Sequence, residues 1–486
     1  MAPAPQYAVI VVGSGFGGLC MGVRLKQAGI DNFLILEKDS EYGGTWWANR
    51  YPGCAVDVPC HLYSFSFAPK PDWSRRYAPQ QELLAYTRSV VRAFGLQSHL
   101  RLGCALLGAQ FDEEGGYWTL QTSGGALTAR SLVSCTGALS RPALPPIEGI
   151  GSFTGPMFHS SRWDHALDLR GKRVAVIGTG ASAIQFVPEI APLAAQLDVY
   201  QRSAPWILPR PDRAIGRAER RLLARVPGLQ RLWRALDYLR HELRAIPMVY
   251  APRMLAVGEW MARRHLARQV GDPRLRAALT PDYALGCKRI LLTNTWYPAL
   301  CRPNVTLLTG AIRAIGARGI VTAQGEERAV DVIVFGTGFD VEHTMGAIDL
   351  RGRGGLSLHA TSDGALEAYK GCTLAGFPNF FMIAGPNTGL GHNSMIYMIE
   401  SGVAYVMGAL QAMRAGGLRS LEVKPEAQAA YNARLQRRLR GTVWSTGCRS
   451  WYLDHTGRNR VLWPGFSFVY RWLTRRFDVG NYTVKP

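Results

Sequence analysis

Two stretches of the chain share one order of hydrophobic and polar positions. Residues 7–12 form an unbroken apolar run, YAVIVV, and a glycine-rich turn, an amphipathic stretch over 17–28 and a second apolar run over 32–38 follow it. Residues 172–202 repeat this order. An unbroken apolar run beside a glycine turn is typical of a strand buried on both faces of a parallel sheet. We therefore expect an α/β fold with two Rossmann-like dinucleotide-binding domains.

The rest of the chain is assigned to these two domains by its order. A third apolar run at 330–340 ends in a glycine turn and extends the second domain, whereas a helical pattern at about 210–285 interrupts that domain as an insertion. A chain of 486 residues is too long for one core. We predict the first domain over 1–152, the second over 153–374, and a return to the first over 375–486.

The chain is strongly basic, with a net charge of +21. No nucleic-acid-binding motif accompanies this charge, so we expect no nucleic-acid partner. Much of the excess is arginine within 210–276, where apolar residues recur at helical spacing. This pattern predicts amphipathic helices, which either are simply solvated or lie on a membrane surface.

The nine cysteines are an odd number and mostly scattered, which is typical of reduced thiols in a cytoplasmic protein. The chain has no apolar run long enough to span a membrane, and its start resembles a strand rather than a signal peptide. We therefore expect a cytoplasmic protein. Cys54 and Cys60 need separate attention, because a redox-active pair here would indicate a disulfide reductase. No cluster of metal ligands is recognisable, so we expect no metal.

The first glycine motif, GSGFGG, carries Gly13, Gly15 and Gly18 between a strand and a helix. Glycines there let the backbone approach a pyrophosphate at the helix N-terminus. Glu37 ends the following strand, where a carboxylate accepts hydrogen bonds from ribose hydroxyls and repels a 2′-phosphate. This motif therefore predicts an FAD site.

The second motif, GTGASA, differs at the residue that selects the nucleotide. The following strand ends in Gln201 and Arg202, without an acidic residue. A guanidinium there pairs well with a 2′-phosphate, so we expect NADPH, unless Arg202 is merely a surface cation. The residues expected to contact the nucleotide in this turn are Gly178, Thr179, Gly180, Ser182 and Ala183.

Between the two motifs lies FTGPMFHSSRW, with Phe153, Gly155, His159 and Trp163 in the pattern F-x-G-x-x-x-H-x-x-x-W. This pattern resembles the fingerprint of the Baeyer–Villiger monooxygenases, flavoenzymes that insert one oxygen atom of O2 beside a ketone carbonyl. The resemblance implies that His159 acts in domain motion and cofactor placement rather than as a catalytic base.

Residues 43–57, GGTWWANRYPGCAVD, are similar to a second signature of the same family. The resemblance implies that Gly44, Thr45 and Trp46 bind cofactor, and that Asp57 is the active-site aspartate. Without the resemblance, Asp57 would be interpreted as a residue that caps a turn.

The segment GCKR is similar to the family's G-x-K-R segment. The resemblance implies that Lys288 recognises the NADPH phosphate and that Arg289 lies over the flavin ring. The alternative is a basic surface pair at the start of a strand. Further along, GPNTGLGHNS resembles the turn before a helix that points at the flavin, and we include its Asn387 among the cofactor-binding residues. Trp451 aligns with the tryptophan of a mobile loop that folds over NADP+.

The family's reaction explains these residue types. It implies that NADPH reduces the flavin, that O2 adds to give a flavin peroxide, and that the peroxide attacks a ketone to form a tetrahedral adduct. The peroxide and the tetrahedral adduct are both anionic. A fixed cation stabilises both of them, and arginine is always charged. A buried arginine needs a counter-charge, for which Asp57 is the candidate. We therefore assign Arg289 and Asp57 as catalytic, with FAD and NADPH as cofactors and a ketone and O2 as substrates.

Three other functions share parts of this pattern. A flavin-containing monooxygenase that oxidises nitrogen or sulfur has the same two-domain plan, but Trp163, Asp57 and Arg289 together favour ketone oxidation. A regulator could keep the fold without turnover. A disulfide reductase would depend on Cys54. The interpretation that we carry forward is an enzyme that converts ketones to esters or lactones.

Overall fold

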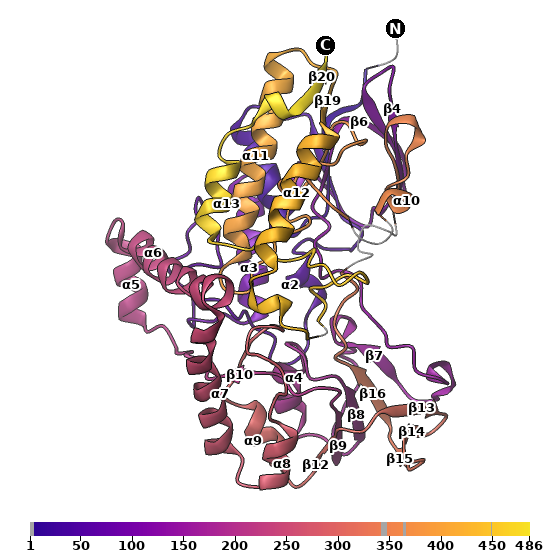
Figure 1. Cartoon of the computed structure of the whole chain (residues 1–486), viewed down its shortest axis with the longest axis vertical. Helices are drawn as coiled ribbons and strands as arrows, with labels where there is room; N and C mark the ends of the chain where they lie inside the picture. Colours follow the sequence, from indigo (N-terminus) through magenta and orange to yellow (C-terminus); the bar gives the residue numbers. More distant parts are fainter. Residues whose placement is uncertain (1–3, 342–347, 363–365, 449) are drawn as a thin grey trace.

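The computed structural model of the chain describes residues 4–341, 348–362, 366–448 and 450–486. Two sheets dominate it, one in the upper and one in the lower half of the molecule (Figure 1). The predicted α/β class with two Rossmann-like units is confirmed.

The first sheet is built around β1 (Tyr7–Val12), which pairs in parallel with β2 (Phe33–Leu36) and β6 (Gly125–Ser134). The helix α1 (Phe16–Gln27) connects β1 to β2 and packs against α11 (Met395–Ala415). Because both faces are covered, Val9, Ile10 and Val11 are at most 2% exposed. The other strands of this sheet are β3 (Leu100–Arg101), β4 (Leu106–Asp112), β5 (Tyr117–Thr122), β17 (Asp349–Arg351) and β18 (Phe380–Met382).

The second sheet has the order β12-β9-β8-β16-β7, and its strands are parallel. Its central strand β8 leads through a glycine turn into α4, as β1 leads into α1 in the first unit. The strands are β7 (Met157–His159), β8 (Arg173–Ile177), β9 (Gln196–Tyr200), β12 (Val305–Leu308) and β16 (Val332–Phe335), and the helices beside them are α4 (Ala183–Ile190) and α9 (Trp296–Leu300).

Each glycine turn packs closely against the backbone directly after a neighbouring strand, β6 in the first sheet and β16 in the second. A Cβ on Gly13, at φ +101°, would lie 2.5 Å from the carbonyl oxygen of Cys135. The corresponding Gly178, at φ +110°, would place a Cβ 2.4 Å from the carbonyl oxygen of Gly336. Only glycine fits such a contact, so the two turns are equivalent features of the two units.

The predicted insertion lies between two short parallel strands, β10 (Ile207–Leu208) and β11 (Leu291–Leu292). Two of its helices project from the body at the left of Figure 1. The insertion consists of α5 (Arg217–Arg225), α6 (Leu229–Glu242), α7 (Leu255–Gln269) and α8 (Pro273–Ala278).

The insertion leaves the second unit but contacts the first one. Arg234 on α6 donates hydrogen bonds to the carbonyl oxygens of His61 (2.8 Å) and Ser64 (2.7 Å). The buried carboxylate of Glu242 accepts from Ser467 Oγ at 2.7 Å, on α13 (Ser467–Thr474). The insertion therefore connects the two halves of the molecule.

The remaining elements complete the two halves. A three-stranded antiparallel sheet, β13-β14-β15, lies beside the second sheet (Figure 1). The strand β17 pairs with β4, so the chain has rejoined the first sheet by Asp349, and the predicted domain limits stay a prediction. The elements not yet given are α2 (Thr45–Ala48), α3 (Gln80–Ala93), α10 (Leu358–Ser362), α12 (Pro425–Leu439), β13 (Ile312–Gly316), β14 (Gly319–Thr322), β15 (Glu327–Ala329), β19 (Ser420–Val423) and β20 (Tyr482–Lys485).

The cysteines differ from the expectation of reduced thiols throughout. Cys287 and Cys448 form a disulfide across 161 residues of sequence, so that expectation is wrong for these two. Cys54 and Cys60 are buried free thiols, and burial raises the pKa of Cys54 to about 12. A buried neutral thiol is a poor nucleophile, so these two residues do not form a redox-active pair in this structure.

None of the helices in the described ranges is long and apolar enough to cross a membrane.

Candidate active site

The first glycine turn and Glu37 form one hydrogen-bonded unit. Glu37 is 6% exposed at the end of β2, and its carboxylate accepts from Ser14 N (2.9 Å) and Ser14 Oγ (2.6 Å). A Cβ on Gly18 would lie 1.8 Å from the carbonyl oxygen of Gly13. The turn therefore requires glycine, and it places a carboxylate beside the start of α1, where a ribose would accompany a pyrophosphate.

The segment around Gly44 lies on this turn. Gly44 has φ +56°, and a Cβ there would lie 2.8 Å from the Cα of Gly15. Thr45 and Trp46 follow on α2, and the ring of Trp46 meets that of Tyr63 edge to face at 5.6 Å. The structure thus brings together two glycine segments that lie far apart in the sequence.

Asn387 provides a test of whether this region fits FAD. It is 2% exposed, and its Nδ2 donates to the carbonyl oxygens of Asn459 (2.9 Å) and Leu462 (3.1 Å). Its buried Oδ1 accepts no hydrogen bond from any described residue. Buried acceptors are rarely left unsatisfied, so this oxygen fits a donor on a bound ligand. The turn at 385–394 then enters α11, which Ser394 caps.

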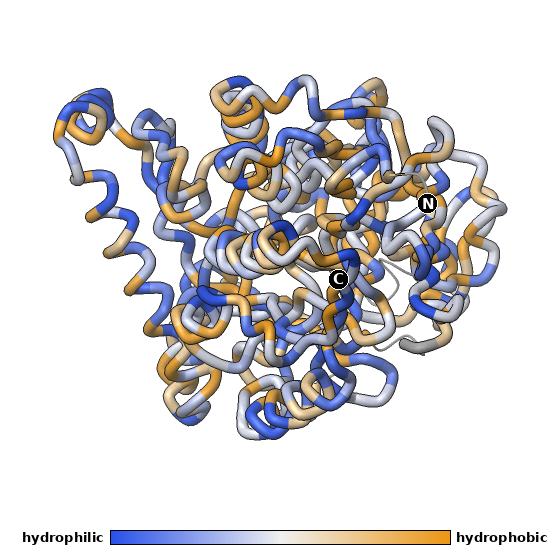
Figure 2. Tube along the Cα trace, turned by 90° about the horizontal axis from the view of Figure 1, so that it is seen from above, coloured by the Kyte–Doolittle hydropathy of each residue, from blue (hydrophilic) through white to orange (hydrophobic). Residues whose placement is uncertain are grey.

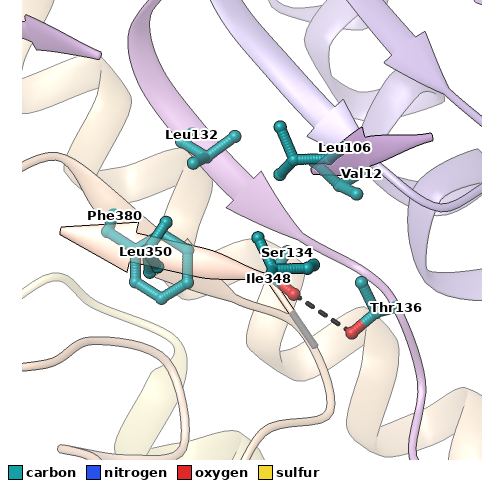
Figure 3. A pocket seen from close by; sticks show the side chains of 8 residues that line it. All are labelled: Val12, Leu106, Leu132, Ser134, Thr136, Ile348, Leu350 and Phe380. Carbon is teal, nitrogen blue, oxygen red and sulfur yellow. Dashed lines mark hydrogen bonds between the residues drawn. The ribbon is translucent and has the colours of Figure 1, made fainter. Parts of the chain in front are cut away.

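A small cavity in the first sheet has a different character. It has a volume of only about 10 Å³, and its lining is almost entirely apolar (Figure 3). Such a space holds one water molecule at most and cannot hold a ketone, so we interpret it as a packing gap. Its lining residues are Val12, Leu106, Leu132, Ser134, Thr136, Ile348, Leu350 and Phe380.

A larger cavity lies at the second glycine turn. Its volume is about 410 Å³, and Ser203 and Lys288 are on its wall. Lys288 Nζ donates to Ser203 Oγ at 2.9 Å, and Thr179 Oγ1 donates to the carbonyl oxygen of Ser203 at 3.4 Å. The other lining residues are Asp282, Tyr283, Ala284, Thr446, Gly447 and Cys448.

Lys288 lines this cavity and interacts electrostatically with Arg202. Burial lowers the pKa of Lys288, and the charge of the nearby Arg202 lowers it further. The side chain of Arg202 is exposed. Adjacent cations repel each other unless an anion lies between them. The pair therefore fits a phosphate, as the sequence predicted for Arg202 and Lys288.

The turn itself has room for a nucleotide. A Cβ on Gly180 would have no neighbour closer than 3.9 Å, so the backbone is open at that point. Ser182 precedes α4, and Ala183 opens it. The N–H groups at the start of α4 are then available to a pyrophosphate.

Arg289 and Asp57 form an ion pair across 232 residues of sequence. Arg289 Nη2 donates to Asp57 Oδ2, and the carboxylate raises the pKa of Arg289 above its ordinary value. The side chains are 40% and 33% exposed, so a ligand can reach both. The structure therefore pairs the two residues that the sequence predicted as catalytic.

The loop that carries Asp57 is fixed against the second unit. Gln185 on α4 accepts a hydrogen bond from Tyr51 at 2.9 Å and donates one to the carbonyl oxygen of Ala55 at 3.0 Å. A Cβ on Gly53 would lie 2.7 Å from the carbonyl oxygen of Gln185. The position of Asp57 thus depends on both units.

Two tyrosines next to the ion pair were missed by the sequence reasoning. Tyr63 and Tyr452 interact electrostatically with both Arg289 and Asp57. Burial raises the pKa of each to about 12, so both phenols stay neutral at physiological pH. Both tyrosines lie far from at least one member of the pair in the sequence, so only the fold shows that they interact with it.

The fingerprint residues lie on the edge of the second sheet. His159 ends β7 opposite Phe335 of β16, and its Nδ1 is 2.9 Å from Ser161 Oγ. Burial lowers the pKa of His159 to about 4, so the imidazole is neutral at pH 7. Trp163 packs on Phe186 of α4, with ring centroids 5.2 Å apart. These contacts fit a role in positioning the second unit.

The other two fingerprint residues and Trp451 are also placed by packing. A Cβ on Gly155 would lie 2.6 Å from the carbonyl oxygen of Asp331, and Phe153 packs in the core beside Ile315. Trp451 is 43% exposed, with its ring 4.5 Å from that of Tyr452. Tyr452 in turn interacts electrostatically with Arg289.

Comparison with known proteins finds relatives that span nearly the whole chain. Residues 10–216 match the family model described as pyridine nucleotide-disulphide oxidoreductase. The chain is 51% identical, over 99% of its length and 92% of the relative, to a Baeyer-Villiger monooxygenase of Pseudomonas aeruginosa. It is 47% identical, over 98% of its length and 92% of the relative, to a Baeyer-Villiger monooxygenase of Streptomyces coelicolor.

Solved structures share the whole fold. A structure described as oxidized steroid monooxygenase bound to NADP has a TM-score of 0.87 and 32% identity, with 99% of each chain covered. A closed crystal structure of cyclohexanone monooxygenase has a TM-score of 0.88 and 26% identity, with 99% of this chain and 100% of that chain covered.

Proposed function

The chain belongs to the Baeyer–Villiger monooxygenases, and from this premise we propose that Arg289, oriented by Asp57, is the cation beside which oxygen insertion takes place. The enzyme depends on FAD and NADPH and converts ketones to esters or lactones. The observation that supports the roles of these residues is the ion pair itself, because both side chains are paired and yet remain accessible.

The chemistry of the pair follows from its charges. Bound FAD supplies the reduced flavin that activates O2, with electrons from NADPH. Arg289 then offers donors to an oxyanion that develops on the ketone carbonyl. Asp57 keeps the guanidinium in place, and the neutral phenols of Tyr63 and Tyr452 add donors without a competing charge.

The cofactor sites are proposed from the same geometry. Gly13, Gly15, Gly18, Glu37 and Asn387 would hold FAD, with Gly44, Thr45 and Trp46 as the adjoining wall. The turn from Gly178 to Ala183 would hold the pyrophosphate of NADPH, and Arg202 and Lys288 its 2′-phosphate. The division into domains at 1–152, 153–374 and 375–486 stays a prediction of the sequence, with β17 at 349–351 already in the first sheet, and a cytoplasmic location is part of this proposal.

Substitution of Arg289 tests the assignment. Arg289→Ala should still oxidise NADPH but should form ester or lactone at least about 100-fold more slowly, because a preorganised charge contributes on the order of 3 kcal/mol to such a transition state. Product mass after incubation with a ketone panel and labelled O2 measures this. Arg289→Lys is the matched control, and it should retain part of the activity because it keeps the charge.

Three outcomes of this experiment would change the assignment. Normal product formation by Arg289→Ala would remove the role of Arg289. Oxidation of sulfide or amine probes by the wild type, with every ketone unchanged, would favour heteroatom oxidation instead. If Arg289→Ala loses both NADPH oxidation and product formation, Arg289 is needed for cofactor binding.

We also propose that the insertion contacts an anionic membrane surface. Leucines 232, 236, 239 and 243 are 39–55% exposed and recur at helical spacing on α6 and directly after it. Trp260 and Val257 on α7 are 59% and 64% exposed. Figure 2 shows apolar and polar residues alternating in this projecting region. Apolar stripes of this extent usually contact a partner.

The charges of the insertion favour lipid over a second copy of the chain. Residues 210–276 contain sixteen arginines and six acidic residues, so two such surfaces would repel each other, whereas anionic headgroups would neutralise them. Wild-type enzyme should float with vesicles that contain phosphatidylglycerol and should not float with phosphatidylcholine alone. Trp260→Ser with Leu239→Ser should reduce flotation about tenfold, whereas Leu107→Ser, an exposed leucine on β4, should not. Equal flotation of both variants would contradict the proposal.

A further inference from the structure

The disulfide lies beside residues of the active site. Cys287 directly precedes Lys288 and Arg289, and Cys448 follows the short helix Val443–Ser445. Their Cα atoms are 6.3 Å apart, within the range of ordinary disulfides. The crosslink therefore connects the C-terminal loop to the segment that carries Lys288 and Arg289.

The same loop forms part of the nucleotide cavity. Thr446, Gly447 and Cys448 line it together with Ser203 and Lys288. Four residues after Cys448, Tyr452 interacts with Arg289. The loop is thus crosslinked to the segment 287–289 and also interacts with it electrostatically.

The two sulfurs differ in accessibility. Cys287 is fully buried, whereas Cys448 is partly exposed. A partly exposed cysteine can react with a small oxidant, and a buried cysteine next to it can then displace the product of that reaction. Cys301 is the one exposed free cysteine in the described part of the chain, and it does not line the cavity.

We propose that Cys287 and Cys448 form a reversible redox modification site that closes the C-terminal loop over bound NADP(H). Hydrogen peroxide would oxidise the Cys448 thiol to a sulfenic acid and release one water. The Cys287 thiol would then attack that sulfur, form the disulfide and release a second water. Two thiols thus lose two electrons and two protons to one peroxide.

A disulfide in a cytoplasmic protein is usually transient or redox-sensing, which agrees with a reversible role. NADPH consumed without oxygenation of a ketone yields hydrogen peroxide, so the oxidant would report unproductive turnover. The crosslinked loop retains the nucleotide and slows the next cycle, and reduction by a thiol reopens the cavity. This inference rests on the proposal that the cavity between Ser203, Lys288 and the loop binds the nucleotide.

The test compares oxidised and reduced holoenzyme. Peptide mapping by mass spectrometry should show the 287–448 crosslink after hydrogen peroxide and its loss after dithiothreitol. Calorimetric titration with NADP+ should then give a dissociation constant about tenfold lower for the oxidised form, because a fixed wall removes the cost of ordering the loop. Cys448→Ser should bind like the reduced wild type under both treatments, and Cys301→Ser should respond to redox treatment as the wild type does.

Each of the other possible results contradicts one part of this proposal. Free thiols at both positions after peroxide, or a crosslink that dithiothreitol does not reduce in native enzyme, would refute the reversible site. A reversible crosslink with unchanged NADP+ affinity would refute its effect on the cavity. Unaltered NADP+ affinity in Lys288→Ala would instead refute the nucleotide site, and this result is independent of the state of the cysteines.

Discussion

At the scale of single residues, two neighbouring cations have different partners and therefore different tasks. Lys288 is bonded to a neutral hydroxyl, Ser203, and borders the cavity, whereas Arg289 is bonded to the carboxylate of Asp57. An unpaired charge remains available to an anionic ligand, while a paired one is fixed in direction. One dipeptide thus serves nucleotide binding and oxygenation separately.

The choice of nucleotide is predicted from this arrangement. Arg202→Ala should raise the KM for NADPH about tenfold or more and leave the KM for NADH nearly unchanged, because only NADPH carries the 2′-phosphate. Initial rates of cofactor oxidation measure both constants. Arg213→Ala, which removes another exposed arginine, is the control and should change neither. Equal losses with both nucleotides would indicate a general effect on the fold.

Acid sensitivity is a second prediction at this scale. Burial lowers the pKa of His392 to about 3, although the carboxylate of Glu242 lies 3.9 Å away. Below the ordinary histidine pKa of about 6.5, His392 binds a proton in the unfolded chain but not in the folded chain. The free energy of unfolding therefore decreases as the pH is lowered from about 6.5 to about 3. His392→Gln should therefore lose about 2 kcal/mol less than the wild type between about pH 7 and pH 5 in denaturant unfolding. Identical pH slopes would contradict the prediction.

Local pattern explains which of these residues could be predicted. Gly13, Gly178, Arg202 and Arg289 lie in short motifs whose spacing reflects backbone geometry or charge, so the sequence carries their signal. Tyr452 and the Cys287–Cys448 pair depend on contacts across 161 residues or more. No local spacing encodes such a contact, and for the cysteines the odd total favoured the wrong expectation.

At the scale of elements, the helix α6 connects parts that the sheets do not. Its residue Glu242 is 3% exposed and accepts from Ser467 Oγ at 2.7 Å and Asn393 Nδ2 at 2.5 Å. The same helix exposes Leu232 and Leu239. Helical periodicity predicted the helix, but it could not show which face docks, because both faces carry apolar residues.

Removal of this carboxylate should detach the helix. Glu242→Leu should lower the free energy of unfolding by about 3 kcal/mol, because the buried donors of Ser467 and Asn393 lose a charged acceptor. Limited proteolysis should then cut the insertion faster at 243–254, before any loss of bound FAD. Glu259→Leu is a control on α7, where the carboxylate accepts one bond, from Leu285 N at 3.0 Å, and should have a smaller effect. Similar proteolysis of both variants would contradict this role of Glu242.

At the scale of the molecule, the two sheets are joined by loops that lie beside the candidate active site. The repeated strand–glycine–helix order was sufficient to predict both units, because each unit is local in sequence. The return of β17 to the first sheet at Asp349 has no such signal, since a strand of three residues carries no periodicity. The docking of the insertion on the first unit was likewise beyond prediction.

That docking has a consequence for chimeric enzymes. The insertion is encoded between β10 and β11 of the second unit, yet Glu242, Arg234 and Arg76–Asp237 bond it to residues encoded in the first. A recombination point placed between the first unit and the second would therefore separate residues that are bonded to each other in this chain. Hybrids of this fold should tolerate exchange only when 210–285 stays with its contacts at 61–76, 393 and 467.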